Sequence, residues 1–316
     1  MQVVCPGGSG ELVAAALIIG LSNGALIALI ALGYTLVYGI IELINFSHGD
    51  LFMLGTFVAL TVLAALGLEG GAAETPWLAL IAAILAAMVF CGVLNMLAER
   101  IAYRRLRNAP RLAPLISAIG VSFIYINIGL FWRGPSPIPF PDLLPDFEFV
   151  RAITGADTLI TFTTKDAFII ATAIPLMLGL GWVIKNTTMG KAMRAVAQDR
   201  EMALQVGIDV DKVISFTFLL GGLLAGAAAV MHGLYNGNTV FTLGFTAGLK
   251  AFTAAVLGGI GNVTGAALGG FLLGILGAMT VTCYGGEWEN VGVFTLLVVI
   301  LVFRPTGLLG EETPER

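Results

Sequence analysis

The chain has 316 residues, of which 58% are hydrophobic and 11% are charged, and its formal net charge is −4. Soluble domains carry about 25% charged residues, so this composition cannot cover a water-facing surface and excludes a soluble globular protein. The three cysteines have no paired spacing, which indicates neither a disulfide framework nor a zinc site. The sequence therefore predicts an integral membrane protein that has the lipid bilayer as its surroundings and no nucleic-acid partner.

Apolar runs of roughly 20 residues, long enough to cross about 30 Å of hydrocarbon, mark the expected membrane spans. They cover residues 12–38, 46–67, 77–98, 113–131, 168–186, 213–235, 262–284 and 288–303. A further segment, 239–260, is apolar but interrupted by glycines, and it forms either a ninth crossing or a re-entrant half-helix. We therefore expect an all-α, polytopic protein with eight or nine transmembrane helices, some broken or re-entrant, in a single domain over residues 1–316.

Polar residues gather where the second span begins, in the stretch 44–51. Ser47 followed three residues later by Asp50 is typical of a capping box, in which the serine hydroxyl accepts from a first-turn N–H. Ionisable groups in membrane spans tend toward functional roles. Asn45, Ser47, His48 and Asp50 are therefore candidates for a transport pathway or its inner gate. A helix cap and a gate are compatible interpretations, and the sequence leaves both open.

Lysine and arginine in the loops predict the orientation, because cytoplasmic loops are enriched in both. The loops 99–112 and 185–212 hold five basic residues each, and an even number of crossings separates them. The loop 132–167 has three basic residues against five acidic ones, and five prolines that suit an extended excursion. We therefore expect cytoplasmic loops at 99–112 and 185–212, a periplasmic loop at 132–167, a cytoplasmic C-terminus and a periplasmic N-terminus.

The loop 185–212 is a charged, helix-forming island in an otherwise oily chain. Thr187 or Thr188 can cap a first short helix, Gly207 supplies a stop, and Asp209 or Asp211 opens the next span. An apolar stripe along the first helix is formed by Ala192, Met193, Val196 and Ala197. The island is either an ordinary solvated loop or a helix that a groove on a cytoplasmic partner receives, and the stripe favours docking.

The segment 239–260 carries a single charge, Lys250, two residues after Gly248. The lysine either extends to a membrane interface or pairs with a buried acid such as Asp50. Gly49 and Asp50 form a similar glycine-and-charge pattern near the start of the chain. Interrupted helices in matching positions are typical of inverted repeats in transporters, so an inverted repeat is one interpretation of this faint symmetry.

Motifs for catalysis are absent from the sequence. The residues Gly190-Lys191-Ala192 lack the upstream glycine and the Ser/Thr of a Walker A motif, and no His/Cys/acid cluster has metal-ligand spacing. We therefore expect no enzyme activity and no metal site. If nucleotide drives transport, another polypeptide hydrolyses it. A self-sufficient secondary transporter would need its own ion relay, and the spans offer few ionisable groups for one.

Four motifs, in this order along the chain, carry a resemblance to a known family. They are Gly33–Ile41 with Ile44–Asp50, Gly190–Asp199 with Ala203–Ile208, Gly248–Gly261, and Arg304–Leu308. Together they resemble the membrane permease of branched-chain amino acid ABC importers. The similarity is greater to the H-type subunit of leucine/isoleucine/valine systems, and it spans roughly residues 15 to 310.

This resemblance implies an inner-membrane permease subunit that translocates branched-chain amino acids. Its implied partners are a second related permease or a second copy, two cytoplasmic ATPase subunits and a periplasmic solute-binding protein. The chain itself would bind no cofactor, since ATP is used by the partners. The 185–212 loop matches the family's ATPase-contacting loop, which makes these residues coupling candidates: Gly190, Arg194, Ala195, Asp199, Ala203 and Gly207. Alternatives are the same machinery importing urea or short amides, or a self-sufficient secondary transporter.

Overall fold

The computed structural model describes residues 10–68, 76–107, 109–110, 112–145, 147–154 and 160–310. Its helices are α1 (Gly10–Ile41), α2 (Ser47–Ala65), α3 (Pro76–Ala98), α4 (Leu112–Arg133), α5 (Phe149–Thr154), α6 (Thr164–Asn186), α7 (Thr188–Gln198), α8 (Arg200–Gln205), α9 (Val210–Asn236), α10 (Leu243–Gly258), α11 (Val263–Tyr284) and α12 (Glu289–Phe303). Short π and 3-10 segments are η1 (Glu99–Tyr103), η2 (Arg104–Leu106) and η3 (Gly286–Trp288), and two short strands are β1 (Ile138–Pro139) and β2 (Asn238–Thr239). The all-α prediction is confirmed. Among the described residues, eight helices are long and apolar enough to cross a membrane, and α10 is a shorter apolar helix.

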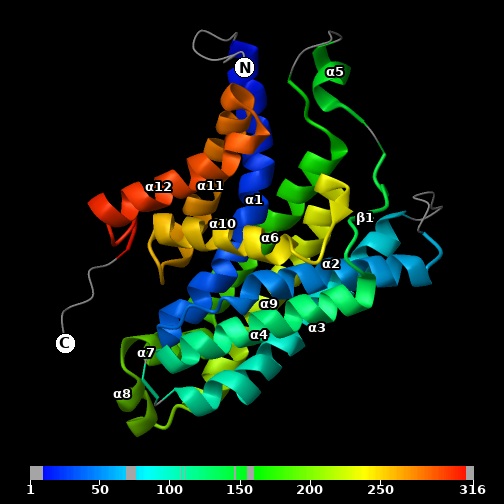
Figure 1. Ribbon diagram of the computed structural model, residues 1–316. Coiled ribbons are helices and arrows are strands. Elements are labelled where there is room, and N and C mark those ends of the chain that lie inside the picture. The colour runs from blue at the N-terminus through cyan, green and yellow to red at the C-terminus, as the bar shows by residue number, and fades with distance from the viewer. Residues whose placement is uncertain are drawn as a thin grey trace.

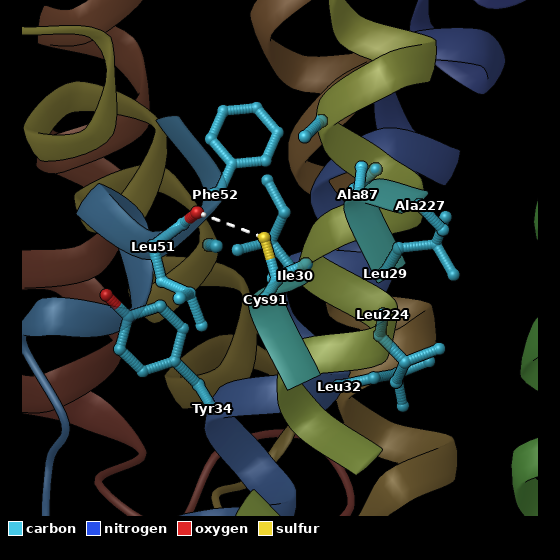
Figure 2. Packing of buried hydrophobic residues seen from close by; sticks show 14 of the residues in the cluster. Leu29, Ile30, Leu32, Tyr34, Leu51, Phe52, Ala87, Cys91, Leu224 and Ala227 are labelled. Carbon is cyan, nitrogen blue, oxygen red and sulfur yellow. Dashed lines mark hydrogen bonds between the residues drawn. The ribbon is translucent and has the colours of Figure 1, made fainter. Parts of the chain in front are cut away.

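The core of the bundle lies where α1, α2, α3 and α9 meet. In α2 and α9, 78% of the most apolar stretch is buried, against 6% in α12, so α2 and α9 are central and α12 is peripheral. Figure 2 shows side chains from all four central helices packed together, with the Cys91 thiol 3.4 Å from the Leu51 carbonyl oxygen to which it donates. The outward apolar faces of the peripheral helices suit contact with lipid.

Small residues allow the helices to approach closely. A Cβ at Gly24 of α1 would lie 2.8 Å from the Phe271 Cα of α11, and one at Gly270 of α11 would meet the backbone of Ala28. Lipid is as apolar as the helix surfaces, so association in a membrane depends on such van der Waals packing rather than on the hydrophobic effect. These contacts pair α1 with α11 in antiparallel fashion along most of their length.

Several segments meet at one end of the molecule, which we call the basic end because Arg107, Arg200 and Arg304 belong to them. Arg200 of α8 donates to the Ile40 carbonyl at the end of α1, and Arg107 pairs with Asp211 at the start of α9. The α10–α11 turn lies at the same end, because a Cβ on Gly39 would be 3.2 Å from the Gly261 Cα. The segment after α12 also returns there, where the N–H groups of Leu308 and Leu309 donate to carbonyls at the end of α10.

The start of α1 lies at the opposite end. At about 1.5 Å per residue, the 32 residues of α1 extend about 48 Å, and Figure 1 shows its first turn far from α7 and α8. Both α9 and α11 begin at the basic end, so α10 and the segment before it carry the chain back from the end of α9. The segment 239–260 is therefore a ninth pass through the bundle, which decides between the two interpretations of its sequence.

The excursion after α4 lies at the end of the molecule away from α7 and α8. Its strand β1 pairs antiparallel with β2 beyond the end of α9, with Ile138 opposite Thr239. The Phe140 N–H also donates to the Gly237 carbonyl, and a Cβ on Gly233 would collide with the Phe140 ring. These contacts fix the first part of the excursion to α9. Of the acids expected in this loop, Asp146 and Asp157 lie outside the described residues.

Candidate functional site

The helical structure is interrupted at residues 42–46, between α1 and α2. We call this non-helical segment the break. Glu42 has a left-handed backbone, with φ of +53°, and the following residues are non-helical before α2 begins. The capping box expected for Ser47 and Asp50 is wrong, because no side chain caps the first turn of α2. The Ser47 hydroxyl instead donates to the Asn45 amide oxygen at 2.7 Å, and Asp50 accepts from the Ser122 hydroxyl of α4. Tertiary partners have replaced the local cap.

A buried polar network holds this break. The Tyr103 hydroxyl of η1 donates to the Asn45 amide oxygen at 2.9 Å and lies 3.0 Å from the Ser47 hydroxyl. The Asn45 amide donates to Asn95 of α3 at 3.3 Å, and Asn95 donates to the Phe218 carbonyl of α9 at 2.7 Å. Buried networks of this kind fix one arrangement of the backbone when each member has a partner. The break is therefore a conformation that specific hydrogen bonds stabilise, rather than a frayed helix end.

His48 and Asp50, in the first turn of α2, are fully enclosed. The His48 ring lies edge-on against Tyr34 with centroids 4.8 Å apart, and both of its nitrogens lack a hydrogen-bond partner among the described residues. One Asp50 carboxylate oxygen is likewise unpartnered. Ionisable groups inside a membrane bundle are costly and tend to mark pathways. The structure buries Asn45, Ser47, His48 and Asp50 inside the bundle, and their role in a pathway or gate stays a prediction.

Lys250 is separate from this group. Its ammonium lies 2.6 Å from the Glu289 carboxylate at the start of α12, so the pairing with Asp50 considered from the sequence is wrong. The two glycine-and-charge patterns do meet, through their glycines: a Cβ on Gly49 would lie 2.7 Å from the Gly248 Cα. This contact lays the first turn of α2 directly on α10.

A small hollow of about 10 Å³, partly open to the outside, lies beside the break. It is lined by Tyr34, Tyr38, Ile44, Phe252, Ala255 and Ile260. These side chains are aromatic or aliphatic and come from α1, the break, α10 and the α10–α11 turn. The break therefore has an apolar wall on the side facing α10.

The island at 185–212 forms two short helices with capped ends. The Thr187 hydroxyl accepts from the Gly190 N–H at 3.0 Å, which confirms the expected cap of α7. Asp199 caps α8 by accepting from two first-turn N–H groups, and Gly207 ends it with φ of +85°. Asp209 then accepts from the Lys212 N–H at the start of α9, as the sequence predicted.

The apolar stripe of α7 is used within the chain itself. Met193 and Val196 are buried, and α7 packs against α1, α6 and α9. The expectation that a partner's groove receives this stripe is therefore wrong, since the stripe holds α7 on its own bundle. The faces left exposed present Lys191 and Arg194 of α7, together with apolar side chains just beyond: Met202, Leu204 and Val206, of which Val206 is 72% exposed.

The six coupling candidates divide into residues that position α7 and α8 on the bundle and a residue that faces outward. Gly190 permits close contact, because its Cβ would lie 2.7 Å from the Ile184 carbonyl carbon, and Ala203 is buried. Asp199 and Gly207 set the ends of α8, while Ala195 is half-buried. Arg194 is exposed and donates to the Ile184 carbonyl at the end of α6. Most of these residues therefore position α7 and α8, and Arg194 faces outward.

Sequence reasoning missed Arg200 as a link between α8 and α1. Its guanidinium donates to the Ile40 carbonyl at 2.9 Å. Burial lowers the pKa of Arg200, nearby Arg107 lowers it further, and Glu42 opposes both effects. Arg200 is thus partly buried among charges at the basic end. Asn95, Glu99 and Tyr103 were missed as well, although their spacing of four residues along an apolar span is a readable signal.

Comparison with known proteins decides the family. A family model described as branched-chain amino acid transport system / permease component matches residues 16–303. The chain belongs to this family. It is 41% identical over 303 residues to the high-affinity branched-chain amino acid transport system permease protein BraD of Pseudomonas aeruginosa, covering 95% of this chain and 96% of the relative. It is 40% identical to LivH, the corresponding Escherichia coli permease, covering 94% and 95% of the two chains.

A solved structure, PsaBC from Streptococcus pneumoniae in complex with Fab, aligns with 94% of this chain and 91% of that chain at a TM-score of 0.44 and 15% identity. The family model and the relatives confirm the resemblance carried by the four motifs. The protein is a multi-pass transport permease, and its family is one of permeases rather than enzymes.

Proposed function

We propose that this chain is the transmembrane subunit of an ATP-driven importer of branched-chain amino acids in a bacterial inner membrane. Relatives that align along nearly its whole length are named as permeases for such amino acids. The chain binds no cofactor itself, and its partners are a second permease, two ATPase subunits and a periplasmic binding protein.

The family match along nearly the whole chain carries the proposal, and the contact between α8 and the end of α1 gives it a route through the protein. Arg200 connects α8 to the Ile40 carbonyl, two residues before the break that holds Asn45. A movement of α7 and α8 driven by partner ATPases reaches the α1–α2 break through this bond and through the buried face of α7. The exposed residues Met202, Leu204 and Val206 offer those ATPases an apolar surface.

Transport by the reconstituted complex tests this function. The chain would be co-expressed with the ATPase, permease and binding protein encoded by neighbouring genes and placed in liposomes. We expect labelled leucine to accumulate with ATP and not with a non-hydrolysable analogue, and isoleucine or valine in excess to compete. Competition by urea or acetamide instead would reassign the cargo. Uptake by this chain alone, without ATPases, would refute the proposal.

A further inference from the structure

Glu99 is a fully enclosed carboxylate at the junction of α3 with the π-helical turn η1. Arg104 donates to it at 3.2 Å, Arg107 forms a second ion pair with it, and the Ser215 hydroxyl of α9 donates to it at 2.6 Å. Arg107 also pairs with Asp211. The cluster is electrically balanced, with two acids against two arginines, and it fastens η1 and η2 to the start of α9.

Glu99 lies on the same helix as the residues that hydrogen-bond to the break. Asn95, Glu99 and Tyr103 follow one another every four residues along α3 and η1, and all three are buried. The outer two bond to Asn45, and the middle one bonds to Ser215. Side-chain contacts therefore tie this helix to the start of α9 through Glu99 and to the α1–α2 break through Asn95 and Tyr103, and the backbone of α3 and η1 joins the two sets.

Stability alone does not account for this arrangement. Glu99 is enclosed while its arginine partners are partly exposed; removing its carboxylate from water costs about as much as the attraction returns, so ion pairs of a buried acid are a poor source of stability and are better attested as devices that fix one arrangement. Single π-helical turns within α-helices are uncommon and occur frequently at functional sites. Here both features coincide at Glu99, four residues after Asn95, through which α3 reaches the break.

We propose that Glu99 is a positioning residue that couples movement of the start of α9 to the α1–α2 break. The start of α9 directly follows α8, so displacement of the two short helices moves Asp211 and Ser215. The arginine-bridged carboxylate passes that displacement to η1, and Tyr103 passes it to Asn45. This role rests on the proposed function, because it assigns the route by which partner ATPases act on the gate.

The first test removes one hydroxyl. Tyr103→Phe keeps the ring that packs against Phe218 and loses the bonds to Asn45 and Ser47. We expect the number of leucine molecules imported per ATP hydrolysed to fall about fivefold, the equivalent of one hydrogen bond, with assembly and ATP hydrolysis unchanged. The matched control is Tyr125→Phe, the same change at a buried position of α4 outside these contacts, which keeps the wild-type ratio.

The second test removes the ion pair without leaving an unpaired charge. Glu99→Gln alone leaves two arginines against the single acid Asp211 and lowers the yield of folded complex, whereas Glu99→Gln/Arg107→Gln restores the charge balance and the yield. We expect the double variant still to hydrolyse ATP and to import fewer molecules per ATP. Wild-type ratios in both Tyr103→Phe and the double variant would overturn the proposal. A wild-type complex that shows no ATP-dependent uptake at all would instead refute the proposed function.

Discussion

Asp50 is an ionisable residue inside the helix bundle, close to the α1–α2 break. It is buried in the first turn of α2, with one carboxylate oxygen bonded to Ser122 and the other unpartnered. A stabilising role would use both oxygens, since an unpaired buried acceptor carries a desolvation cost. We propose that Asp50 belongs to the transport route, and this proposal predicts a separation between folding and activity.

Replacing Asp50 with alanine tests that separation. Because the substitution removes an imperfectly paired buried charge, we expect the purified yield and the melting temperature to change little, and leucine uptake to fall about tenfold, the equivalent of 1.4 kcal/mol. Ser122→Ala is the control for the single bond that Asp50 makes, and it should lower uptake less. Unchanged uptake in Asp50→Ala would remove Asp50 from the pathway and leave it a packing residue.

Gly49 shows how little space separates α2 from α10. Any Cβ there would lie 2.7 Å from the Gly248 Cα, and backbone cannot move aside as a flexible side chain can. Gly49→Ala should therefore destabilise the protein by about 1–3 kcal/mol, the usual range for overpacking, seen as a lower melting temperature in detergent. Gly120→Ala in α4 has no atom within 4 Å of its Cβ and should be neutral; equal effects of the two substitutions would contradict the close approach.

Side-chain partners were the least predictable feature at this scale. The Ser47 and Asp50 spacing fits a local cap, yet Tyr103 and Ser122 supply partners from distant segments. Lys250 pairs with Glu289, which lies 39 residues later, because α12 packs against α10. A single sequence gives each polar residue's capacity to bond but not which helix brings the partner. The role of these candidates in transport stays a prediction, while the contacts expected for Ser47, Asp50 and Lys250 were wrong.

At the scale of elements, α7 shows what amphipathicity can and cannot specify. Its Thr187 cap and the buried part of its stripe, Met193 and Val196, follow from the sequence pattern, whereas its end at Gln198 was not predicted. Which surface covers the stripe does not follow, because a hydrophobic face is equally suited to a partner and to the chain's own helices. The structure places Met193 and Val196 against the bundle, so any partner must contact the charged face of α7 and the exposed end of α8.

Charge reversal on α7 tests this division. Arg194 is exposed and donates to the Ile184 carbonyl at the end of α6, so Arg194→Glu both loses that bond and reverses the charge on the outward face. We expect several-fold less ATPase to co-purify, with membrane insertion intact. Met193→Asp, on the buried face, should instead reduce the amount of folded chain. Normal co-purification of Arg194→Glu would count against a docking role for this face.

The elements themselves were largely predictable. Each expected span contains a helix, because a run of about 20 apolar residues has few alternatives in a bilayer, and α6 merely begins earlier, at Thr164. The number of passes was not predictable, because the glycines of 239–260 fit both a crossing and a re-entrant segment. Helix packing decides the number of passes. Gly39 lies beside Gly261, so the α10–α11 turn lies at the end of α1, and segment 239–260 must run from the end of α9 back to that end.

At the scale of the whole molecule, the basic end gathers every segment that the proposed mechanism uses. The end of α1, the η1–η2 turn, α7, α8 and the start of α9 are joined there by Arg200 and Arg107. The start of α1 lies at the other end (Figure 1). From the excess of basic residues in cytoplasmic loops, we propose that the basic end is the cytoplasmic one, which would place α7 and α8 on the side of the ATP supply.

Thiol labelling in spheroplasts tests this sidedness. In a variant with Cys5, Cys91 and Cys283 replaced by alanine, a cysteine would be introduced at exposed Lys191 of α7 or at exposed Glu287 of η3. Because η3 follows the end of α11 that lies beside the start of α1, Glu287→Cys should react with an impermeant maleimide in intact spheroplasts. Lys191→Cys should react only after permeabilisation. The reverse pattern would place α7 and α8 away from the ATP supply, and docking of ATPases on them would have to be abandoned.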